Sequence, residues 1–339
     1  MVLLLTTLVM DLKGQGNPKG ILLKADQIFD PYYAYEYDHH LIPKDLKGRK
    51  EYLAGKLIGH QQYQSGNLIF SYRFEMKDAH TFDTNTVEIK ATLFNERSEI
   101  SKQYVLNSTS GVSIYEHQSV KANGVQVNFK RIKEGSFSFI KTLTTMEQLL
   151  NSPELKQMEA ASLAAPIYKY VFNAKKQLTR FIEFNDSQDT TYVVKFKYST
   201  DERTLTYEYY NTDGSITDQM DVEFLANCFY KATQRKKIKS FKWIKLRNGQ
   251  EEIMDQYAYI HGADCKIQYE EMGFGGRKYK TVYEVDNSDY WTSKKSYDAN
   301  GTTLLAFYQR KFNDRGLLTH LSMRFKEDKK NHLFHYTYE

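Results

Sequence analysis

The sequence is poor in proline, cysteine and tryptophan. Only five of its 339 residues are proline, and none lies between Ile167 and Glu339. Proline has no backbone N–H and is excluded from central strands, so the proline-free stretch favours continuous antiparallel pairing. A helical bundle would be poor in proline too, so the scarcity supports a β fold without proving it.

Cys228 and Cys265 are the only two cysteines. Neither belongs to a C-x-x-C pair or to a cluster with histidine, which argues against a metal site. In an exported protein they can form a disulfide. Two small buried thiols are the equally good alternative at this point.

The sequence also lacks a long hydrophobic run and a strong charge of one sign. A mean hydropathy of -0.64 and 26% charged residues argue against several membrane spans. The net charge of +5 is small for this length and does not require a nucleic-acid partner. The apolar run at residues 1–10 is too short to cross a bilayer, which needs about 20 residues.

Residues 1–16 resemble a signal peptide, because an apolar run of about ten residues is followed by small residues up to Gly16. The usual positive charge before such a run is missing, and a buried first strand or helix is the alternative. We expect an exported protein that is periplasmic, on the cell surface or secreted.

Aromatic residues are abundant, with 27 tyrosines and 20 phenylalanines. Tyrosine suits sheets that have one wet face, because its body is apolar and its tip polar. Residues 68–76, 87–94 and 125–132 alternate apolar with polar side chains, the period of a half-buried strand. The predicted fold is all-β: an antiparallel meander of tyrosine-rich hairpins, in regions 17–143 and 167–339.

The period changes between residues 144 and 166, which predicts a short helical segment that joins the two β regions. Thr144 and Glu147 have the spacing of a capping box, and Pro153 stands at a first helical position. Pro166 is expected to end the run.

The second β region contains an imperfect repeat of 12 to 15 residues, about one strand and one turn. An aromatic residue followed by Asn, Asp or Ser recurs, and several copies continue with a turn glycine and an apolar-Thr pair, as in residues 213–217 and 314–319. The aromatic positions are Phe172, Phe184, Tyr198, Tyr210, Tyr297 and Phe312.

This pattern resembles the YD or RHS-type repeats of secreted bacterial proteins. The resemblance covers at most residues 168–338 and is patchy between residues 224 and 297. It implies extended or shell-like β sheets that act in surfaces, encapsulation and recognition more than in catalysis. It carries over no catalytic residue.

Candidate ligand-binding residues come from aromatic clusters. Tyr32, Tyr33, Tyr35 and Tyr37 can form a platform for a sugar or a partner strand, or can plug the end of the first sheet. Trp243 lies among basic residues, as in surfaces that bind single-stranded nucleic acid, a glycan or an acidic polymer. An inward-facing tryptophan is the alternative.

Two other pairs of residues favour catalysis or metal binding only weakly. Asp221 and Glu223 share a strand face at a separation that suits a glycosidase pair, but such acids are also ordinary on a solvated sheet. His332 and His335 are three residues apart, so on a strand they point to opposite faces and cannot chelate one ion together. Neither a metal nor another cofactor is predicted.

The sequence discloses no biochemical activity. The leading hypothesis is an exported, non-enzymatic envelope or surface protein that binds an envelope polysaccharide or a protein partner, not nucleic acid, and has no membrane span. The alternative is an envelope glycan hydrolase with a carboxylate site built from loops. An outer-membrane barrel is disfavoured because charges fall on both faces of many strands, as at residues 195–198.

Overall fold

The computed structural model confirms the all-β prediction. It describes residues 43–76, 82–95, 100–120, 124–133, 137–160, 165–175, 177–185, 187–229, 236–247, 250–274, 277–286, 290–327 and 331–339. Strands account for 69% of the structure and helices for 8%. The predicted signal peptide lies outside the described residues, so it stays a prediction.

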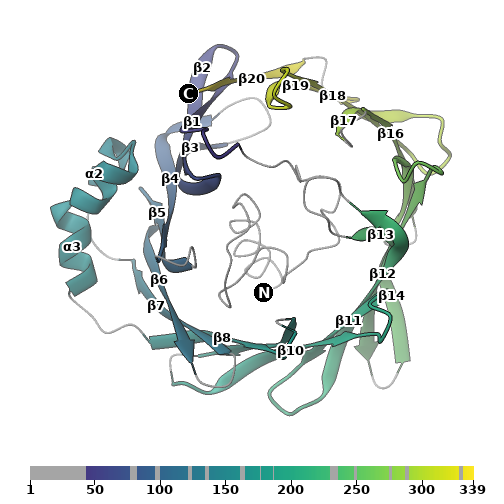
Figure 1. The fold of residues 1–339 in the computed structure, drawn as a ribbon, viewed down its shortest axis with the longest axis horizontal. Coiled ribbons are helices and arrows are strands. Elements are labelled where there is room, and N and C mark those ends of the chain that lie inside the picture. The colour runs from purple at the N-terminus through teal and green to yellow at the C-terminus, as the bar shows by residue number, and fades with distance from the viewer. Residues whose placement is uncertain are drawn as a thin grey trace. The chain divides into compact units, whose positions relative to one another are not determined.

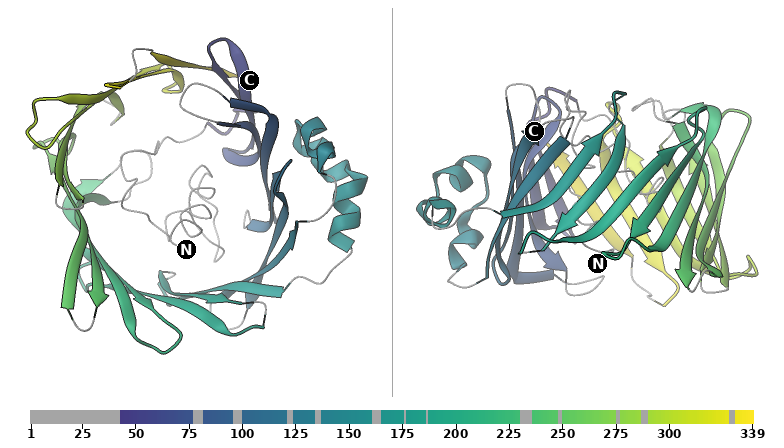
Figure 2. Two further views of the ribbon diagram at one scale, coloured as in Figure 1. Left: turned by 180° about the vertical axis from the view of Figure 1, so that it is seen from behind. Right: turned by 90° about the horizontal axis from the view of Figure 1, so that it is seen from below.

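The chain divides into two compact units. In the described ranges, unit 1 comprises the residues up to Thr191 together with Thr337–Glu339, and unit 2 comprises Tyr192–Tyr336. Within each unit, consecutive strands can be followed by their labels in Figure 1 and by their colours in Figure 2. The division of the chain into β regions at residues 17–143 and 167–339 stays a prediction.

Within the part of the chain that the structure describes, unit 1 contains nine strands and three helices. The strands are β1 (Gly48–Leu53), β2 (Lys56–Gln64), β3 (Asn67–Met76), β4 (Phe82–Phe94), β5 (Ile100–Asn107), β6 (Gly111–Val120), β7 (Gly124–Ile132), β8 (Ala165–Phe172) and β9 (Leu178–Phe184). The helices are the 3₁₀ helix η2 (Ser138–Thr142), α2 (Met146–Asn151) and α3 (Pro153–Ala160). Each strand pairs antiparallel with the next one.

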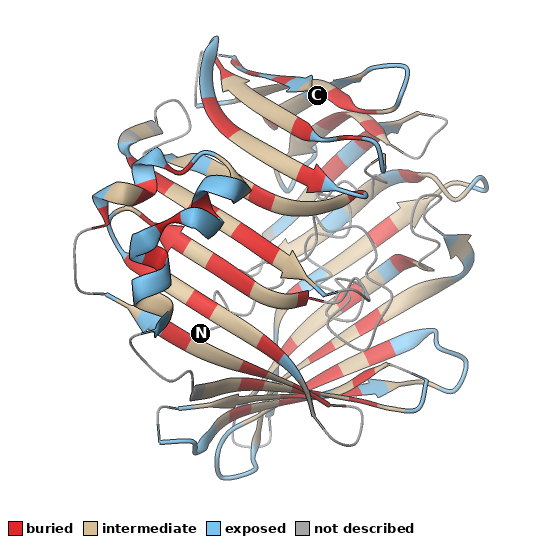
Figure 3. Cartoon of the chain, turned by 60° about the vertical axis from the view of Figure 1, so that its left-hand side comes forward, coloured by how far each residue is buried: buried red, intermediate tan, exposed pale blue. Residues whose placement is uncertain are grey.

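The helices cover one face of the sheet in unit 1 (Figure 3). Ile140, Leu149 and Leu155 are almost fully buried there, against apolar side chains of β3, β4, β5 and β6. Burying these three side chains removes apolar surface from water, which stabilises the folded state by about 25 cal/mol per Å² of surface buried. This burial holds such short helices in place.

Capping decides where the helices begin. The side chain of Thr145 accepts a hydrogen bond from the backbone N–H of Gln148, so α2 is capped one residue later than the predicted capping box. Pro153 is the first residue of α3, as predicted. The prediction for Pro166 is wrong: α3 ends at Ala160, and Pro166 lies in β8.

Among the residues that the structure describes, unit 2 is a longer meander of eleven strands. They are β10 (Thr190–Tyr198), β11 (Thr204–Tyr210), β12 (Ile216–Phe229), β13 (Lys236–Arg247), β14 (Gln250–His261), β15 (Ile267–Phe274), β16 (Arg277–Val285), β17 (Trp291–Tyr297), β18 (Leu304–Phe312), β19 (Leu318–Phe325) and β20 (His332–Tyr338). The first two residues of β10 and the last two of β20 belong to unit 1.

One hairpin turn recurs through both units and accounts for the sequence repeat. Its first residue receives a backbone hydrogen bond from the residue three places on, as Asn211 does from Gly214. That fourth position has a left-handed backbone, with φ of 81° at Gly214 and 68° at Gly301, which is why glycine recurs there. The left-handed residues of six such turns are Gln188, Glu202, Gly214, Cys265, Gly301 and Gly316.

A threonine side chain closes this turn with a hydrogen bond to the backbone. The threonine stands six residues after the first turn residue. Its hydroxyl donates to the backbone carbonyl of the residue two positions before the first turn residue, as Thr217 does to Tyr209 over 3.3 Å. The same bond joins Thr179, Thr191, Thr292 and Thr319 to Val171, Glu183, Glu284 and Lys311. A serine, Ser101, makes the same bond to Leu93 in unit 1. The apolar-Thr pair of the repeat is therefore a turn-closing element.

The repeat extends into the part of the sequence where it is hard to recognise. Gly262 begins a turn with the same backbone closure, although residues 224–297 match the sequence pattern only patchily. Asp286 donates its backbone N–H to the carbonyl of Tyr290, four places on, as Asn211 does to Ser215. The turn at Gly262 has a glycine first and Cys265 at the left-handed position, so neither residue matches the pattern.

Cys228 and Cys265 form a disulfide with a Cα–Cα distance of 5.5 Å. Of the two alternatives that the sequence leaves open, the structure selects the paired state. The bond links the end of β12 to the turn between β14 and β15, and so reaches across β13.

Candidate functional site

Of the five predicted ligand-binding residues, only Trp243 can be placed. Tyr32, Tyr33, Tyr35 and Tyr37 lie outside the described residues. Trp243 is half-buried in β13, directly opposite Met220, and its indole N–H donates to Asp218 over 3.2 Å.

The sheet of unit 2 has an aromatic face. Cross-strand partners stack their rings on it, as Phe241 and Tyr257 do with ring centroids 4.4 Å apart, and most of its side chains are buried. Direct pairing places these residues on it: Phe196, Tyr198, Leu205, Tyr207, Met220, Val222, Phe241, Trp243, Tyr257, Met272 and Tyr279. Trp243 therefore belongs to the face that is packed rather than wet.

The opposite side of the same strands forms what we call the charged face. It contains lysines from four strands, β10, β13, β16 and β17, with tyrosine and phenylalanine rings between them. The charged face includes Lys195, Lys197, Glu208, Tyr210, Asp221, Lys242, Tyr269, Lys278, Lys280, Lys295 and Phe307. Lys195 and Lys197 thus share one face, and they do not illustrate charges on both faces of a strand.

Two lysines of the charged face lie over aromatic rings. The Lys195 ammonium is 3.9 Å from the centroid of the Tyr210 ring, and Lys280 is 3.9 Å from that of Tyr269. A cation over a ring is attracted by the quadrupole of the ring, by about 0.5–1 kcal/mol at exposed sites. These contacts order the lysines and leave Lys195 and Tyr210 only half-buried.

Glu208 organises the neighbouring part of the charged face. It accepts hydrogen bonds from Lys197 and from the Tyr210 hydroxyl, the latter over 2.7 Å. Burial opposes ionisation of Glu208, but its two donors outweigh burial and lower the pKa of the carboxyl. The hydrogen bond to Glu208, together with burial, raises the pKa of Tyr210 to about 12. The carboxylate is therefore ionised at neutral pH and holds both partners in place.

Asp221 and Glu223 are each engaged by partners of their own. Asp221 accepts from the Thr206 hydroxyl over 2.7 Å, and Glu223 accepts from Lys239 over 2.7 Å. The hydrogen bond from Lys239 lowers the pKa of Glu223. A glycosidase pair needs one carboxyl with a raised pKa that can donate a proton. The arrangement favours a structural role for this pair.

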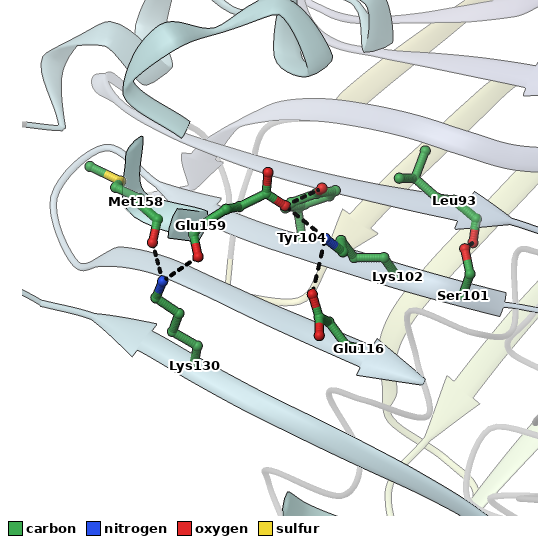
Figure 4. A network of polar contacts seen from close by, with 8 residues as sticks. All are labelled: Leu93, Ser101, Lys102, Tyr104, Glu116, Lys130, Met158 and Glu159. Carbon is green, nitrogen blue, oxygen red and sulfur yellow. Dashed lines mark hydrogen bonds and ion pairs between the residues drawn. The ribbon is translucent and has the colours of Figure 1, made fainter. Parts of the chain in front are cut away.

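A polar network in unit 1 fixes α3 to the sheet (Figure 4). Glu159 accepts from Lys102 over 2.9 Å and from the Tyr104 hydroxyl over 2.7 Å. Lys102 also pairs with Glu116, and Lys130 donates to the carbonyl oxygens at the end of the helix. Burial opposes ionisation of Glu159, but the hydrogen bonds from Lys102 and Tyr104 outweigh it and lower its pKa. This network serves helix docking.

His117 is a buried titratable group on a different face of unit 1. Its Nε2 lies 3.0 Å from the side-chain oxygen of Gln103, and burial lowers the pKa of His117 to about 3. A histidine with this pKa stays neutral throughout the physiological range, so it cannot act as a proton shuttle near neutral pH.

Sequence inspection missed one pair of histidines. His332 is buried, on the opposite side of β20 from His335. The prediction that these two histidines cannot chelate one ion together fits this placement. His335 instead lies directly opposite His320 of β19, with Nδ1 of His335 3.2 Å from Nε2 of His320. The two positions are 15 residues apart, so only the pairing of the strands brings them together.

Across the described ranges, no helix is both long and apolar enough to cross a membrane. Within those same ranges, no group of three or more histidine, cysteine, aspartate or glutamate side chains is arranged to hold a metal ion.

Comparison with protein-family models finds no match, and neither does comparison with curated protein sequences. Solved structures give distant similarities. A porin-like protein from Bacteroides uniformis is 9% identical, with 87% of this chain and 98% of that chain covered and a TM-score of 0.36. A protein of unknown function from Bacteroides fragilis is 12% identical, with 39% and 90% covered and a TM-score of 0.25.

A third similarity is to the TcdB2-TccC3 structure. It has 11% identity and a TM-score of 0.28, and covers 82% of this chain but only 15% of that one. At such low identities and TM-scores, none of the three carries a conclusion about what this chain does.

Proposed function

We propose that the chain is an exported, non-enzymatic binding protein that holds an anionic polymer, such as an acidic polysaccharide of the cell envelope, on the charged face of unit 2. The observation behind this proposal is that lysines from four strands, with aromatic rings among them, share one face of the sheet. This face supplies positive charge and flat apolar surfaces together.

The geometry suits a repeating ligand better than a small one. Lys242, Lys278 and Lys295 come from β13, β16 and β17. Neighbouring strands lie about 4.8 Å apart, so Lys242 and Lys278, three strands apart, are separated by roughly 14 Å across the sheet. A polymer with an anionic group on each repeating unit can contact several of them at once, which adds many weak interactions into one useful affinity.

The aromatic rings add contacts that a bare row of charges lacks. Tyr210 and Tyr269 are held beside their lysines by cation–π contacts, so a bound sugar can stack on a ring while its acidic group meets the ammonium. Tyrosine also loses little conformational entropy when it binds, because it has only two side-chain torsions.

Two observations support export. Disulfides persist in oxidising compartments, and the pairing of Cys228 with Cys265 fits such a compartment. The resemblance of residues 168–338 to YD or RHS-type repeats implies a surface or recognition role of the same kind.

A binding series with polysaccharides tests the proposal. The protein is titrated with an acidic polysaccharide, with its carboxyl-reduced neutral counterpart and with a neutral glucan, at several salt concentrations. We expect binding only to the acidic polymer, and an affinity that falls steeply with salt because surface charges are screened. Equal binding to the acidic and the reduced polymer would contradict the proposed role of the lysines, and release of reducing ends would favour the hydrolase alternative.

A further inference from the structure

His320 and His335 are arranged like the two ligands of one metal ion. A Zn²⁺–N bond is about 2.0–2.1 Å long, so two nitrogens at a tetrahedral angle lie roughly 3.3 Å apart. The two facing nitrogens of His320 and His335 are 3.2 Å apart, and the imidazole centroids are 4.7 Å apart. An ion can therefore be placed between them without moving the backbone.

The hydrogen bonds around His320 indicate which of its nitrogens can bind a metal. The Thr319 hydroxyl donates to the carbonyl of Lys311 over 3.1 Å, so it can only accept from Nδ1 of His320, which is 3.1 Å away. Nδ1 of His320 therefore carries the proton, and Nε2 presents its lone pair to His335. Such a partner on the second nitrogen fixes the ring of a metal-binding histidine.

Charge near the site has two opposing effects. Burial, His335 and Lys311 together lower the pKa of His320, which favours the unprotonated imidazole. Lys311 lies opposite His320 on β18, and its positive charge repels a cation. The three residues form one row across β18, β19 and β20.

We propose that His320 and His335 form a surface site for a divalent transition-metal ion, with water in the remaining coordination positions. Imidazole ligands suit Zn²⁺, Ni²⁺ and Cu²⁺, whereas Mg²⁺ and Ca²⁺ prefer oxygen. The site selects by ligand type, and its affinity follows the order Cu²⁺ above Ni²⁺. In the ion-free state the same two nitrogens share a proton in an N–H···N hydrogen bond.

Calorimetric titration of the full-length, tag-free protein with Zn²⁺, Ni²⁺ and Mg²⁺ tests the proposal. We expect His320→Gln and His335→Gln each to weaken Zn²⁺ binding at this site at least about tenfold, and the double variant to bind no more weakly than either single one. His261→Gln, on another hairpin of unit 2, is the matched control and should leave binding unchanged. Lys311→Ala should strengthen binding by removing the repulsion.

Unfolding curves in EDTA show whether the variants fold like the natural chain. The sequence also has two adjacent histidines at residues 39 and 40, outside the described residues. A His39→Gln/His40→Gln variant separates any metal binding by these two residues from binding at the proposed site. Zn²⁺ affinity that survives in the His320→Gln/His335→Gln variant with unchanged stoichiometry would overturn the proposal. So would a natural chain that takes up neither Zn²⁺ nor Ni²⁺ at millimolar concentration.

Discussion

Cys228 and Cys265 are linked across β13, and the Lys237 ammonium from that strand donates to the carbonyl of Cys265 over 2.8 Å. The disulfide closes a sequence separation of 37 residues. On the chain-entropy model, a loop of this length adds roughly 3–4 kcal/mol to the free energy of unfolding. The bond therefore holds three strands of unit 2 together.

We expect Cys228→Ser/Cys265→Ser to lower the free energy of unfolding by that amount. Denaturant unfolding under non-reducing conditions measures it, and the natural chain in reducing buffer is the control, since it should unfold like the variant. A variant that unfolds at the same denaturant concentration as the oxidised natural chain would show that the two cysteines are not paired.

The shared geometry of the repeat turn predicts that the same substitution at equivalent positions lowers the free energy of unfolding by equal amounts. Gly214 and Gly301 both have a positive φ, and a methyl group added at either would meet no atom within 4 Å. Gly214→Ala and Gly301→Ala should therefore each lower stability by about 1 kcal/mol through backbone strain alone. The two turns are separate, so the costs should add in the double variant. Unfolding midpoints measure both, and an unchanged midpoint in either variant would contradict the shared turn geometry.

Docking of α3 should depend on acid pH through Glu159. Its pKa is lowered in the folded protein from an ordinary 4.5, so its stabilising contribution is complete above that value and is lost as the pH falls through the lowered pKa. Glu159→Gln should cost about 1 kcal/mol at pH 7, and the difference from the natural chain should shrink below about pH 4. Glu147→Gln on α2 is the control. A difference that stays constant with pH would contradict the ionic role of Glu159.

The fold class could be predicted because the relevant signals are local. Alternation of side chains in residues 68–76 and the missing prolines after Ile167 depend only on neighbouring positions. Pro153 at the start of α3 is similarly a one-residue signal. The sequence predicts the helix cap at Thr144, one residue before the observed cap at Thr145. Both threonines are good capping residues, and only the side-chain geometry decides between them.

The candidate site could be predicted only in part. The alternation of Lys195 and Lys197 with aromatic residues can be read directly from the sequence, but the gathering of lysines from four strands on one face depends on the register of several strands. The contact of His320 with His335 likewise needs the pairing of β19 with β20. The basic neighbours of Trp243 in the sequence predict a binding role for it. In the structure, the alternation of side chains along β13 places Trp243 on the aromatic face, opposite Met220.

The proposed function rests on the lysines that lie over aromatic rings, so the decisive measurement compares Lys195→Ala/Lys280→Ala with Lys141→Ala/Lys156→Ala in binding an acidic polysaccharide at low salt. Both variants lose two positive charges, but Lys141 and Lys156 are exposed on the helices of unit 1. We predict that the first variant loses most of its affinity and part of its salt dependence, while the second binds like the natural chain. Equal affinity of the two variants would contradict binding through the charged face.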